Sequence, residues 1–514
     1  MQVKILWADD EIDLLKPHIM FLNNKGYHVD TVNNGSDAIE KCEALSYDII
    51  FLDENMPGIS GLETLTEIKQ IRPHVPVVMI TKSEEEAIME EAIGGNISDY
   101  LIKPVNPNQI LLSLKKNLDQ SKLVAEKTNA DYQQEFRQIG MQLTDNLNAD
   151  EWIAIFQKLV YWDIQLQNSG DEGMLDVLDM QQKEANQQFG KFIEDNYTNW
   201  LNCVEESPQL LHTLFKNKVA PLLDEPLFLI VIDNLRYDQW RILRPAINNY
   251  FSIEEEDVVF SILPTATQYA RNAFFAGLLP SEIAKKYPNY WKGEEDEGGK
   301  NNFEKELLQE QLKRLGKDIK LGYNKITNLE AGKKLNDQFN QLLNNDLNVI
   351  VYNFVDMLSH ARTDMKVIRE LADDEAAYRS LTESWFEHSP LQQIIKKIAE
   401  KGINTIITTD HGTVKVNEAV KIVGPKSTNT NLRYKTEKNL NYDEKKVFQV
   451  KNPEDAFLPK SNLSSEFVFC KNNSFFVYPN NFNHFLNHYK DTFQHGGISL
   501  EEMLIPFVRL TPKK

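Results

Sequence analysis

The stretch that decides the N-terminal fold is residues 48–58, DIIFLDENMPG. A short apolar run that ends in acidic residues and is followed by proline and glycine predicts a buried β-strand leading to Asp53. Similar runs alternate with helical patterns throughout residues 1–118. Five such βα units predict a doubly wound parallel sheet, with its functional site at the carboxyl ends of the strands. The predicted strands are Val3–Ala8, His28–Val32, Asp48–Leu52, Val75–Ile80 and Asp99–Ile102, and the predicted helices are Ile12–Lys25, Ser36–Leu45, Gly61–Ile71, Glu84–Gly94 and Asn108–Leu118.

Polar side chains follow four of these predicted strands. ILWADDE ends in Asp9 and Asp10, the central strand ends in Asp53, VVMIT ends in Thr81, and Lys103 follows YLI. Each of these residues alone could be a helix cap or part of a turn. Together, three carboxylates at adjacent strand ends repel one another and call for a hard cation such as Mg²⁺. The lysine and the threonine hydroxyl suit the oxygens of a phosphoryl group.

The DDE, DENMPG, T and KP motifs resemble those of two-component receiver domains, and the resemblance covers the whole of residues 1–118. It implies that a sensor histidine kinase phosphorylates Asp53. The other residues to which it gives a role are Asp10 and the Asn55 carbonyl as Mg²⁺ ligands, Asp9 as a ligand through water, Thr81 and Lys103 as phosphoryl contacts, and Tyr100 as the aromatic switch.

Residues 119–206 show no strand pattern. They are rich in Gln, Asn, Glu and Lys, and apolar residues such as Trp152, Phe156 and Leu159 recur at helical spacing. A solvated spacer is the alternative, but the tryptophans and phenylalanines favour packed faces. We expect a bundle of about three helices that links two α/β domains.

Alternation of strands and helices resumes in residues 207–514, which predicts a second α/β domain. Carboxylate, hydroxyl and imidazole groups stand at or just after its predicted strands: Asp233, Thr265, Thr267, Asp356, His360, Asp410, His411 and His495. Asp356 and His360 are four residues apart, so that in a helical turn both can bind one ion. Oxygen and nitrogen ligands of this kind suit Zn²⁺ or Mn²⁺. Two polar segments, Tyr287–Asn302 and Val416–Ser465, are predicted to be long loops of the kind that form lids or binding loops.

The strings DHG, HGG with SLEE and LIP, and PTAT followed by GLLP resemble the alkaline phosphatase superfamily and, within it, the PglZ domain, from about Leu227 to Leu510. The resemblance implies two Zn²⁺ ions and a threonine nucleophile, with the second threonine of PTAT, Thr267, preferred over Thr265. It further implies a phosphothreonine intermediate that water hydrolyses. The implied ligands are Asp356, His360 and His495 for one ion, and Asp233, Asp410, His411 and the Thr267 oxygen for the other.

The identity of the ester depends on positive charge. A monoester dianion calls for an arginine clamp, and Arg271 and Arg236 are candidates, although each could equally be a structural ion pair. The lack of a clear clamp favours an anionic phosphodiester, for example one derived from nucleotides. Further basic residues in the second polar segment could attract an anion, but a solvated loop face is the preferred interpretation: Lys421, Lys426, Arg433, Lys435 and Lys438.

Composition limits the other functions. The net charge of −20 and the lack of a strongly basic segment disfavour binding to duplex DNA, which is a polyanion. The three cysteines are far apart, which fits a reducing compartment and excludes a thiolate zinc site. No apolar run is long enough to span a bilayer, and no signal peptide is evident, so we expect a cytoplasmic protein without membrane insertion.

The order of receiver, helical bundle and PglZ domain resembles a family of response regulators linked to type IX secretion. That resemblance implies a phosphorylation-promoted homodimer and a zinc-dependent phosphodiesterase output. The alternative is a signalling adaptor whose metal-bound domain contacts a sigma factor or a secretion component without catalysis. A complete ligand set with a nucleophile favours the enzyme.

Overall fold

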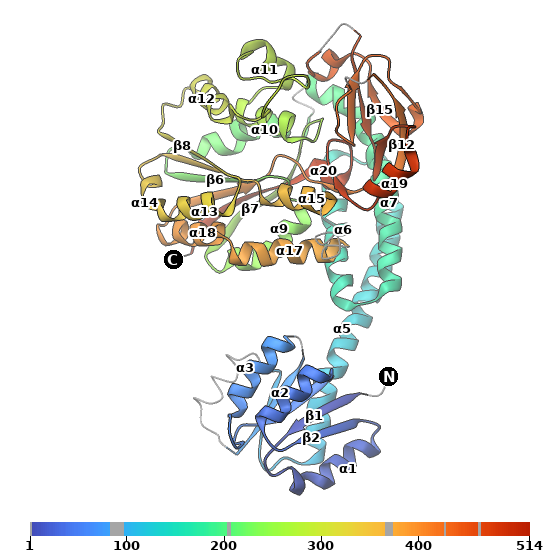
Figure 1. Ribbon diagram of the computed structural model, residues 1–514, viewed down its shortest axis with the longest axis vertical. Helices are drawn as coiled ribbons and strands as arrows, with labels where there is room; N and C mark the ends of the chain where they lie inside the picture. The colour runs from blue at the N-terminus through green and yellow to red at the C-terminus, as the bar shows by residue number, and fades with distance from the viewer. Residues whose placement is uncertain are drawn as a thin grey trace. The chain divides into compact units, whose positions relative to one another are not determined.

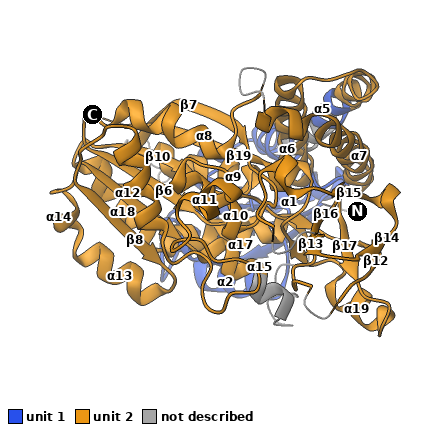
Figure 2. Ribbon diagram, turned by 90° about the horizontal axis from the view of Figure 1, so that it is seen from above, with its two compact units in different colours: residues 1–132, 169–171 blue, residues 133–168, 172–514 orange. Residues whose placement is uncertain are grey.

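The structure is a computed structural model that describes residues 3–73, 75–82, 97–202, 207–364, 374–425, 428–460 and 464–513. The side chains of residues 119–126 and 360–364 are outside this description, as is the predicted helix Glu84–Gly94. The chain folds as two units (Figures 1 and 2), one of residues 1–132 with 169–171 and one of residues 133–168 with 172–514.

The first unit contains a parallel five-stranded sheet in the order β2-β1-β3-β4-β5. Its central strands are completely buried because helices cover both faces of the sheet. The doubly wound fold is therefore confirmed. The strands are β1 (Lys4–Ala8), β2 (His28–Val32), β3 (Ile49–Asp53), β4 (Val77–Thr81) and β5 (Asp99–Ile102), and the helices are η1 (Ile12–Leu15), α1 (Lys16–Asn24), α2 (Gly35–Ala44), α3 (Gly61–Ile71) and α5 (Pro107–Gln142).

One predicted helix end is wrong. Helix α5 does not stop at Leu118 but continues to Gln142. No proline or glycine occurs between Asn108 and Ile139, so nothing in the local sequence ends the helix.

The second unit contains a six-stranded sheet in the order β7-β19-β10-β6-β9-β8. Strands β10, β6, β9 and β8 are parallel, and β19 pairs antiparallel with both β10 and β7. Helices α10, α11 and α12 lie on one side of the sheet, and α9, α17 and α18 lie on the other (Figure 1). The strands are β6 (Leu227–Ile232), β7 (Phe251–Phe260), β8 (Leu321–Ile326), β9 (Leu347–Tyr352), β10 (Asn404–Thr408) and β19 (Leu504–Pro512). The helices of this domain are α8 (Leu211–Leu214), η3 (Phe215–Val219), η4 (Ala220–Leu222), α9 (Tyr237–Asn248), α10 (Thr267–Ala276), α11 (Pro280–Lys286), α12 (Glu304–Arg314), α13 (Leu329–Asp337), α14 (Phe339–Leu342), α15 (Phe354–Asp364), α17 (Glu375–His388), α18 (Pro390–Glu400) and α20 (Leu500–Met503).

The middle of the chain is helical, as predicted, and α6 (Ala149–Ser169) and α7 (Glu172–Asn202) belong to the second unit. The Tyr197 hydroxyl accepts a hydrogen bond from the backbone N–H of Leu263 at 2.8 Å. The rings of Phe189 and Phe260 stack. Among the described residues, no helix combines the length and the apolar character that crossing a bilayer requires.

The prediction of a long loop over Val416–Ser465 is wrong in part, because strands β12, β13, β14 and β15 of this segment pair into small sheets. Strand β12 joins β14 and β17, and β13 and β15 both pair with β16. Arg433 and Lys435 are buried there, so the predicted solvated face is also wrong for these two residues. The elements of this part are β11 (Val414–Lys415), β12 (Glu418–Val423), β13 (Tyr434–Glu437), β14 (Asn441–Tyr442), η5 (Glu444–Lys446), β15 (Val447–Val450), η6 (Pro453–Ala456), β16 (Glu466–Cys470), β17 (Ser474–Val477), α19 (Phe482–Tyr489) and β18 (Phe493–Gln494).

Candidate functional site

The receiver pocket lies at the carboxyl ends of β1 and β3. One carboxylate oxygen from each of Asp9, Asp10 and Asp53 lies within 4.8 Å of the others, a spacing that a metal ion can bridge. Asp9 and Asp53 are buried, whereas Asp10 is exposed. Lys103 Nζ lies 2.8 Å from the Asp9 Oδ2 atom and 2.8 Å from the Asp53 Oδ2 atom. The structure thus brings three carboxylates and one ammonium group into a single pocket.

The electrostatics of this pocket follow from its burial. Burial raises the pKa of Asp53, and the hydrogen bond from Lys103 acts in the opposite direction. Burial lowers the pKa of Lys103, but its hydrogen bonds to Asp53 and Asp9 outweigh that effect and raise it. The backbone of Asn55 also hydrogen-bonds to Asp53, and Thr81 and Tyr100 are hydrogen-bonded to each other. Asp9, Asp10, Asn55 and Lys103 therefore surround Asp53. Thr81 ends the neighbouring strand β4, and Tyr100 lies within β5.

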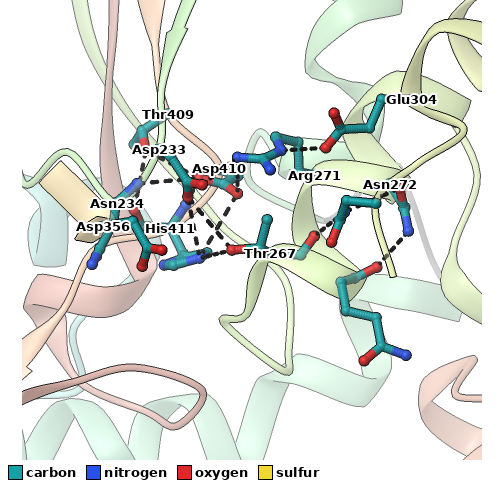
Figure 3. A network of polar contacts seen from close by, with 12 residues as sticks. Asp233, Asn234, Thr267, Arg271, Asn272, Glu304, Asp356, Thr409, Asp410 and His411 are labelled. Carbon is teal, nitrogen blue, oxygen red and sulfur yellow. Dashed lines mark hydrogen bonds and ion pairs between the residues drawn. The ribbon is translucent and has the colours of Figure 1, made fainter. Parts of the chain in front are cut away.

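A second cluster lies at the ends of β6 and β10 in the other unit. Asp233 follows β6, and Asp410 and His411 follow β10, and one ligand atom of each lies within 4.8 Å of the others. All three side chains are buried. Figure 3 shows them converging near Thr267. Burial raises the pKa of Asp233. Two negative charges this close together, on Asp233 and Asp410, repel each other, and a bound cation would reduce that repulsion.

Two of the described histidines, His411 and His495, are oriented as metal ligands usually are. His411 Nδ1 lies 3.0 Å from the Gly412 carbonyl oxygen, and His495 Nδ1 lies 3.1 Å from the Thr265 carbonyl oxygen. Because a carbonyl only accepts, each Nδ1 carries a hydrogen, and it is Nε2 that is left to bind a metal. A backbone acceptor that orients the imidazole in this way is characteristic of metal-binding histidines. The donor set therefore fits a bound divalent metal.

The two threonines of PTAT have different environments. Thr265 is completely buried, and its hydroxyl donates to the Gly497 carbonyl and accepts from the Gly496 N–H. The Thr267 Oγ1 atom lies 3.0 Å from His411 Nε2 and 3.5 Å from Asp233 Oδ1. Thr267 does not end a strand, as the sequence suggested, but begins α10, seven residues after β7 ends. The N-terminus of a helix of this length favours an anion beside it.

Asp356 and His495 lie next to this cluster. His495 Nε2 is 3.8 Å from Asp356 Oδ1, and the rings of His495 and His411 stack with their centroids 4.3 Å apart. Asp356 is in helix α15, which also contains position 360, but the His360 side chain is outside the described residues. The structure thus brings together every described residue of the two predicted ligand sets.

Neither candidate arginine clamp faces the site as a free cation. Arg271 Nη1 lies 2.6 Å from Asp233 Oδ2, and its Nε lies 2.5 Å from Glu304 Oε1. Its burial lowers its pKa, but Asp233 and Glu304 more than compensate and raise it well above the ordinary value. Arg236 is buried in ion pairs with Asp238 and Glu375. Both arginines are therefore engaged in ion pairs with carboxylates of this unit, and Arg271 forms its pairs beside the cluster of Asp233 and Asp410.

Two acidic residues near the site, Glu294 and Glu304, were not predicted from the sequence. Glu304 holds Arg271 against Asp233 from 33 positions further along the chain. Glu294 lines a cavity of about 490 Å³ together with Thr267, Asp356 and His495, and its carboxylate accepts hydrogen bonds from the hydroxyls of Tyr269 and Tyr434. The signal for Glu294 was its place in the polar segment Tyr287–Asn302, which was predicted to be a long loop of the kind that forms lids or binding loops.

Comparisons with known proteins agree with this architecture. Residues 5–115 match the response regulator receiver domain, residues 122–201 match the PorX response regulator linker domain, and residues 214–510 match the BREX system PglZ alkaline phosphatase-like domain. Two curated relatives are the transcriptional regulatory protein ResD of Bacillus subtilis, 34% identical over 22% of this chain and 47% of that protein, and ZraR of Klebsiella oxytoca, 35% identical over 24% and 28%. The chain thus spans less than half the length of either relative.

Two solved receiver structures are also similar to part of the chain. A CheY-like receiver domain from Methanospirillum hungatei is 25% identical, with a TM-score of 0.23 over 23% of this chain and 96% of its own. CheY4 of Vibrio cholerae is 28% identical, with a TM-score of 0.22 over 23% and 100%. The PglZ match alone covers residues 214–510, more than half of the chain. The chain therefore belongs to the PglZ alkaline phosphatase-like family, as a response regulator with a receiver domain and a PorX-type linker.

Proposed function

We propose that the PglZ domain is a zinc-dependent phosphodiesterase in which Thr267 is the nucleophile. The observation that carries this proposal is the position of the Thr267 hydroxyl, 3.0 Å from His411 Nε2 at the N-terminus of α10. A domain that serves only as an adaptor has no need of a hydroxyl group held among metal ligands. The Thr265 hydroxyl, by contrast, forms two hydrogen bonds with the backbone.

The proposed reaction is a double displacement. The Thr267 oxygen loses its proton and attacks phosphorus, the bond from phosphorus to the leaving oxygen breaks, and the leaving oxygen takes up a proton. Water then displaces the Thr267 oxygen, which releases a phosphomonoester and restores the hydroxyl. Zn²⁺ held by Asp233, Asp410 and His411, and a second ion held by Asp356 and His495, would lower the pKa of the hydroxyl and stabilise the phosphoryl oxygens. The N–H groups at the start of α10 add positive potential at the same place.

The charge around the cavity favours a diester over a monoester. Of the residues that the structure describes, those lining the cavity beside Thr267 include Glu294 and Asp356 but neither lysine nor arginine. Arg271 is engaged with Asp233, Glu304 and Asp410, and Arg236 is engaged with Asp238 and Glu375. A monoester dianion would bring a second negative charge without a lysine or arginine beside the metal ions to receive it.

The first prediction concerns metal and ester type. The zinc-loaded chain is expected to bind two zinc ions and to hydrolyse bis(4-nitrophenyl) phosphate with a kcat/KM about tenfold or more above that for 4-nitrophenyl phosphate. Removal of metal with a chelator should abolish the activity, and zinc should restore it. The measurements are metal analysis and release of 4-nitrophenolate at pH 7.

Two other outcomes would change the interpretation. A chain that binds two zinc ions yet cleaves neither ester would support the adaptor, in which the metal centre serves a contact with a sigma factor or a secretion component. A chain that prefers the monoester would show that the charge argument is wrong while leaving the metal centre intact.

We further propose that the receiver regulates this output through phosphorylation of Asp53 by a sensor histidine kinase. Support comes from the buried Asp53 carboxylate beside two other aspartates that could hold Mg²⁺, and from Lys103, which is placed to contact a phosphoryl oxygen. The resemblance to response regulators of type IX secretion further suggests that phosphorylation promotes a homodimer and that the output serves that secretion system.

The second prediction tests the switch. With beryllofluoride and Mg²⁺, wild type is expected to change from monomer to dimer, and Asp53→Asn should remain monomeric because it lacks the acceptor oxygen. Multi-angle light scattering gives the mass directly. Asp48→Asn is a matched control at the other end of β3, where the carboxylate accepts from the Lys4 N–H, and it should respond like wild type. A dimer of Asp53→Asn under the same conditions would refute the assignment.

A further inference from the structure

A second cavity adjoins the one beside Thr267. It has a volume of about 520 Å³ and shares three lining residues, Thr430, Leu432 and Tyr489, with the first. The two cavities therefore adjoin at these residues, and Thr267, Asp356 and His495 line the first of them. The second cavity is lined by residues of β17 and α19.

The walls of this second cavity are mainly aromatic and apolar. Phe476 and Tyr478 line it from the end of β17 and the residue beyond, and Phe485 and Tyr489 line it from α19. The rings of Phe485 and Tyr489 stack 6.2 Å apart. Phe485 is one of the large apolar side chains that remain partly exposed, with 36% of its surface accessible. Walls of this kind suit a flat ring, which can stack on them.

One charged group, Lys435, stands among the described residues that line this cavity. The side chain is only 1% exposed, and its Nζ donates to the Asn429 carbonyl at 2.7 Å and lies 5.2 Å from the centre of the Tyr478 ring. Burial lowers the pKa of Lys435 to about 8. In the part of the chain that the structure describes, no carboxylate forms an ion pair with it. A buried amine of this kind is costly to the fold unless an acceptor reaches its remaining N–H groups.

We propose that the second cavity is a subsite for one ester arm of the phosphodiester, and that it takes an aromatic group carrying a hydrogen-bond acceptor. The proposal rests on the proposed phosphodiesterase function. The phosphoryl group lies at Thr267, the ring stacks between Tyr478 and Phe485, and Lys435 donates to its acceptor. A second phosphate is a poorer fit, because a single buried lysine balances only part of its charge and no further cation lines the cavity among the described residues.

The kinetic test compares two diesters with the same leaving group. Bis(4-nitrophenyl) phosphate has an aromatic second arm with acceptor oxygens, and methyl 4-nitrophenyl phosphate has a methyl arm in its place. Lys435→Met and Phe485→Ala are each expected to lower kcat/KM for the first substrate about five- to tenfold and to leave the second unchanged. Each variant is compared with wild type on the same substrate, so that the different chemical reactivities of the two esters cancel.

The control is Leu329→Ala, which truncates another partly exposed apolar side chain, on α13, outside both cavities. It should leave both substrates unaffected. Equal losses on both substrates in Lys435→Met and Phe485→Ala, or no loss on either, would overturn the subsite.

A binding measurement separates this proposal from the proposed function. Diphenylphosphinate carries two aromatic arms and one negative charge, and its P–C bonds resist hydrolysis. By calorimetry, Phe485→Ala should weaken its binding to the zinc-loaded chain about fivefold or more, whereas binding of dimethylphosphinate should be unchanged. If this difference is found in a chain that cleaves no ester, the subsite stands and the catalytic proposal fails. Equal affinity of wild type and Phe485→Ala for diphenylphosphinate would refute the subsite even in an active enzyme.

Discussion

Thr267→Ala is expected to lower kcat for diester hydrolysis by a factor on the order of 10³ or more, because it removes the oxygen that attacks phosphorus. The two carboxylates and the imidazole beside Thr267 remain, so the zinc content should stay that of wild type. Thr267→Ser retains a hydroxyl and should keep activity within about tenfold of wild type. The measurements are single-turnover hydrolysis of bis(4-nitrophenyl) phosphate and metal analysis of the same samples.

Thr265→Ala is the matched control, since Thr265 is two residues away in the same motif. Loss of its hydroxyl leaves the Gly497 carbonyl and the Gly496 N–H without their partner, which should destabilise the fold by about 1–3 kcal/mol. Its effect should therefore be seen mainly in unfolding rather than in kcat. If Thr265→Ala loses the chemistry and Thr267→Ala keeps it, the nucleophile has been assigned to the wrong threonine.

Much of the receiver fold could be predicted from sequence because its determinants are local. Each described strand of its sheet lies within two residues of its predicted bounds, since an apolar run bounded by acidic or turn residues has few alternatives. The strand-end rule also works for the site, because parallel strands bring their carboxyl ends to one edge. Asp233 and Asp410 are neighbours for that reason. The backbone N–H of Asn234, the residue after Asp233, donates a hydrogen bond to the Asp410 carboxylate, which is 176 positions further along the chain.

The errors that concern buried polar residues of the second unit have a common physical cause. Strand β13 reads YKTE and looks like a solvated loop, yet all four of its residues are buried. Arg433, just before it, is buried because Glu502 pairs with its guanidinium from 69 positions away. Polar side chains can be buried when residues distant in the sequence form hydrogen bonds or ion pairs with them. The composition of a short stretch of sequence does not indicate which distant residues those are. Glu304 was missed beside Arg271 for the same reason.

The ion pairs of Arg271 with Asp233 and Glu304 lead to the second prediction with a large expected effect. Arg271→Met is expected to reduce the free energy of unfolding of the second unit by about 3–5 kcal/mol. The substitution leaves the buried carboxylates of Asp233 and Glu304 without the cation that they share. Glu304 retains Lys325 at 3.0 Å and the Tyr323 hydroxyl, so the larger share of the cost falls on Asp233. Methionine fills a similar volume, which keeps a cavity from adding to the loss. Urea unfolding of the full chain, followed by circular dichroism in a chelator, measures the change.

The control for this prediction is Arg244→Met, which breaks the pair of a half-exposed arginine with Glu256 at 3.0 Å and should cost no more than about 1 kcal/mol. Zinc supplies the decisive comparison. A divalent ion at Asp233 and Asp410 provides the positive charge that Arg271→Met has lost, so zinc should stabilise this variant more than it stabilises wild type. If zinc stabilises both proteins equally, Asp233 does not contact the metal, and the ligand set must be assigned to other residues.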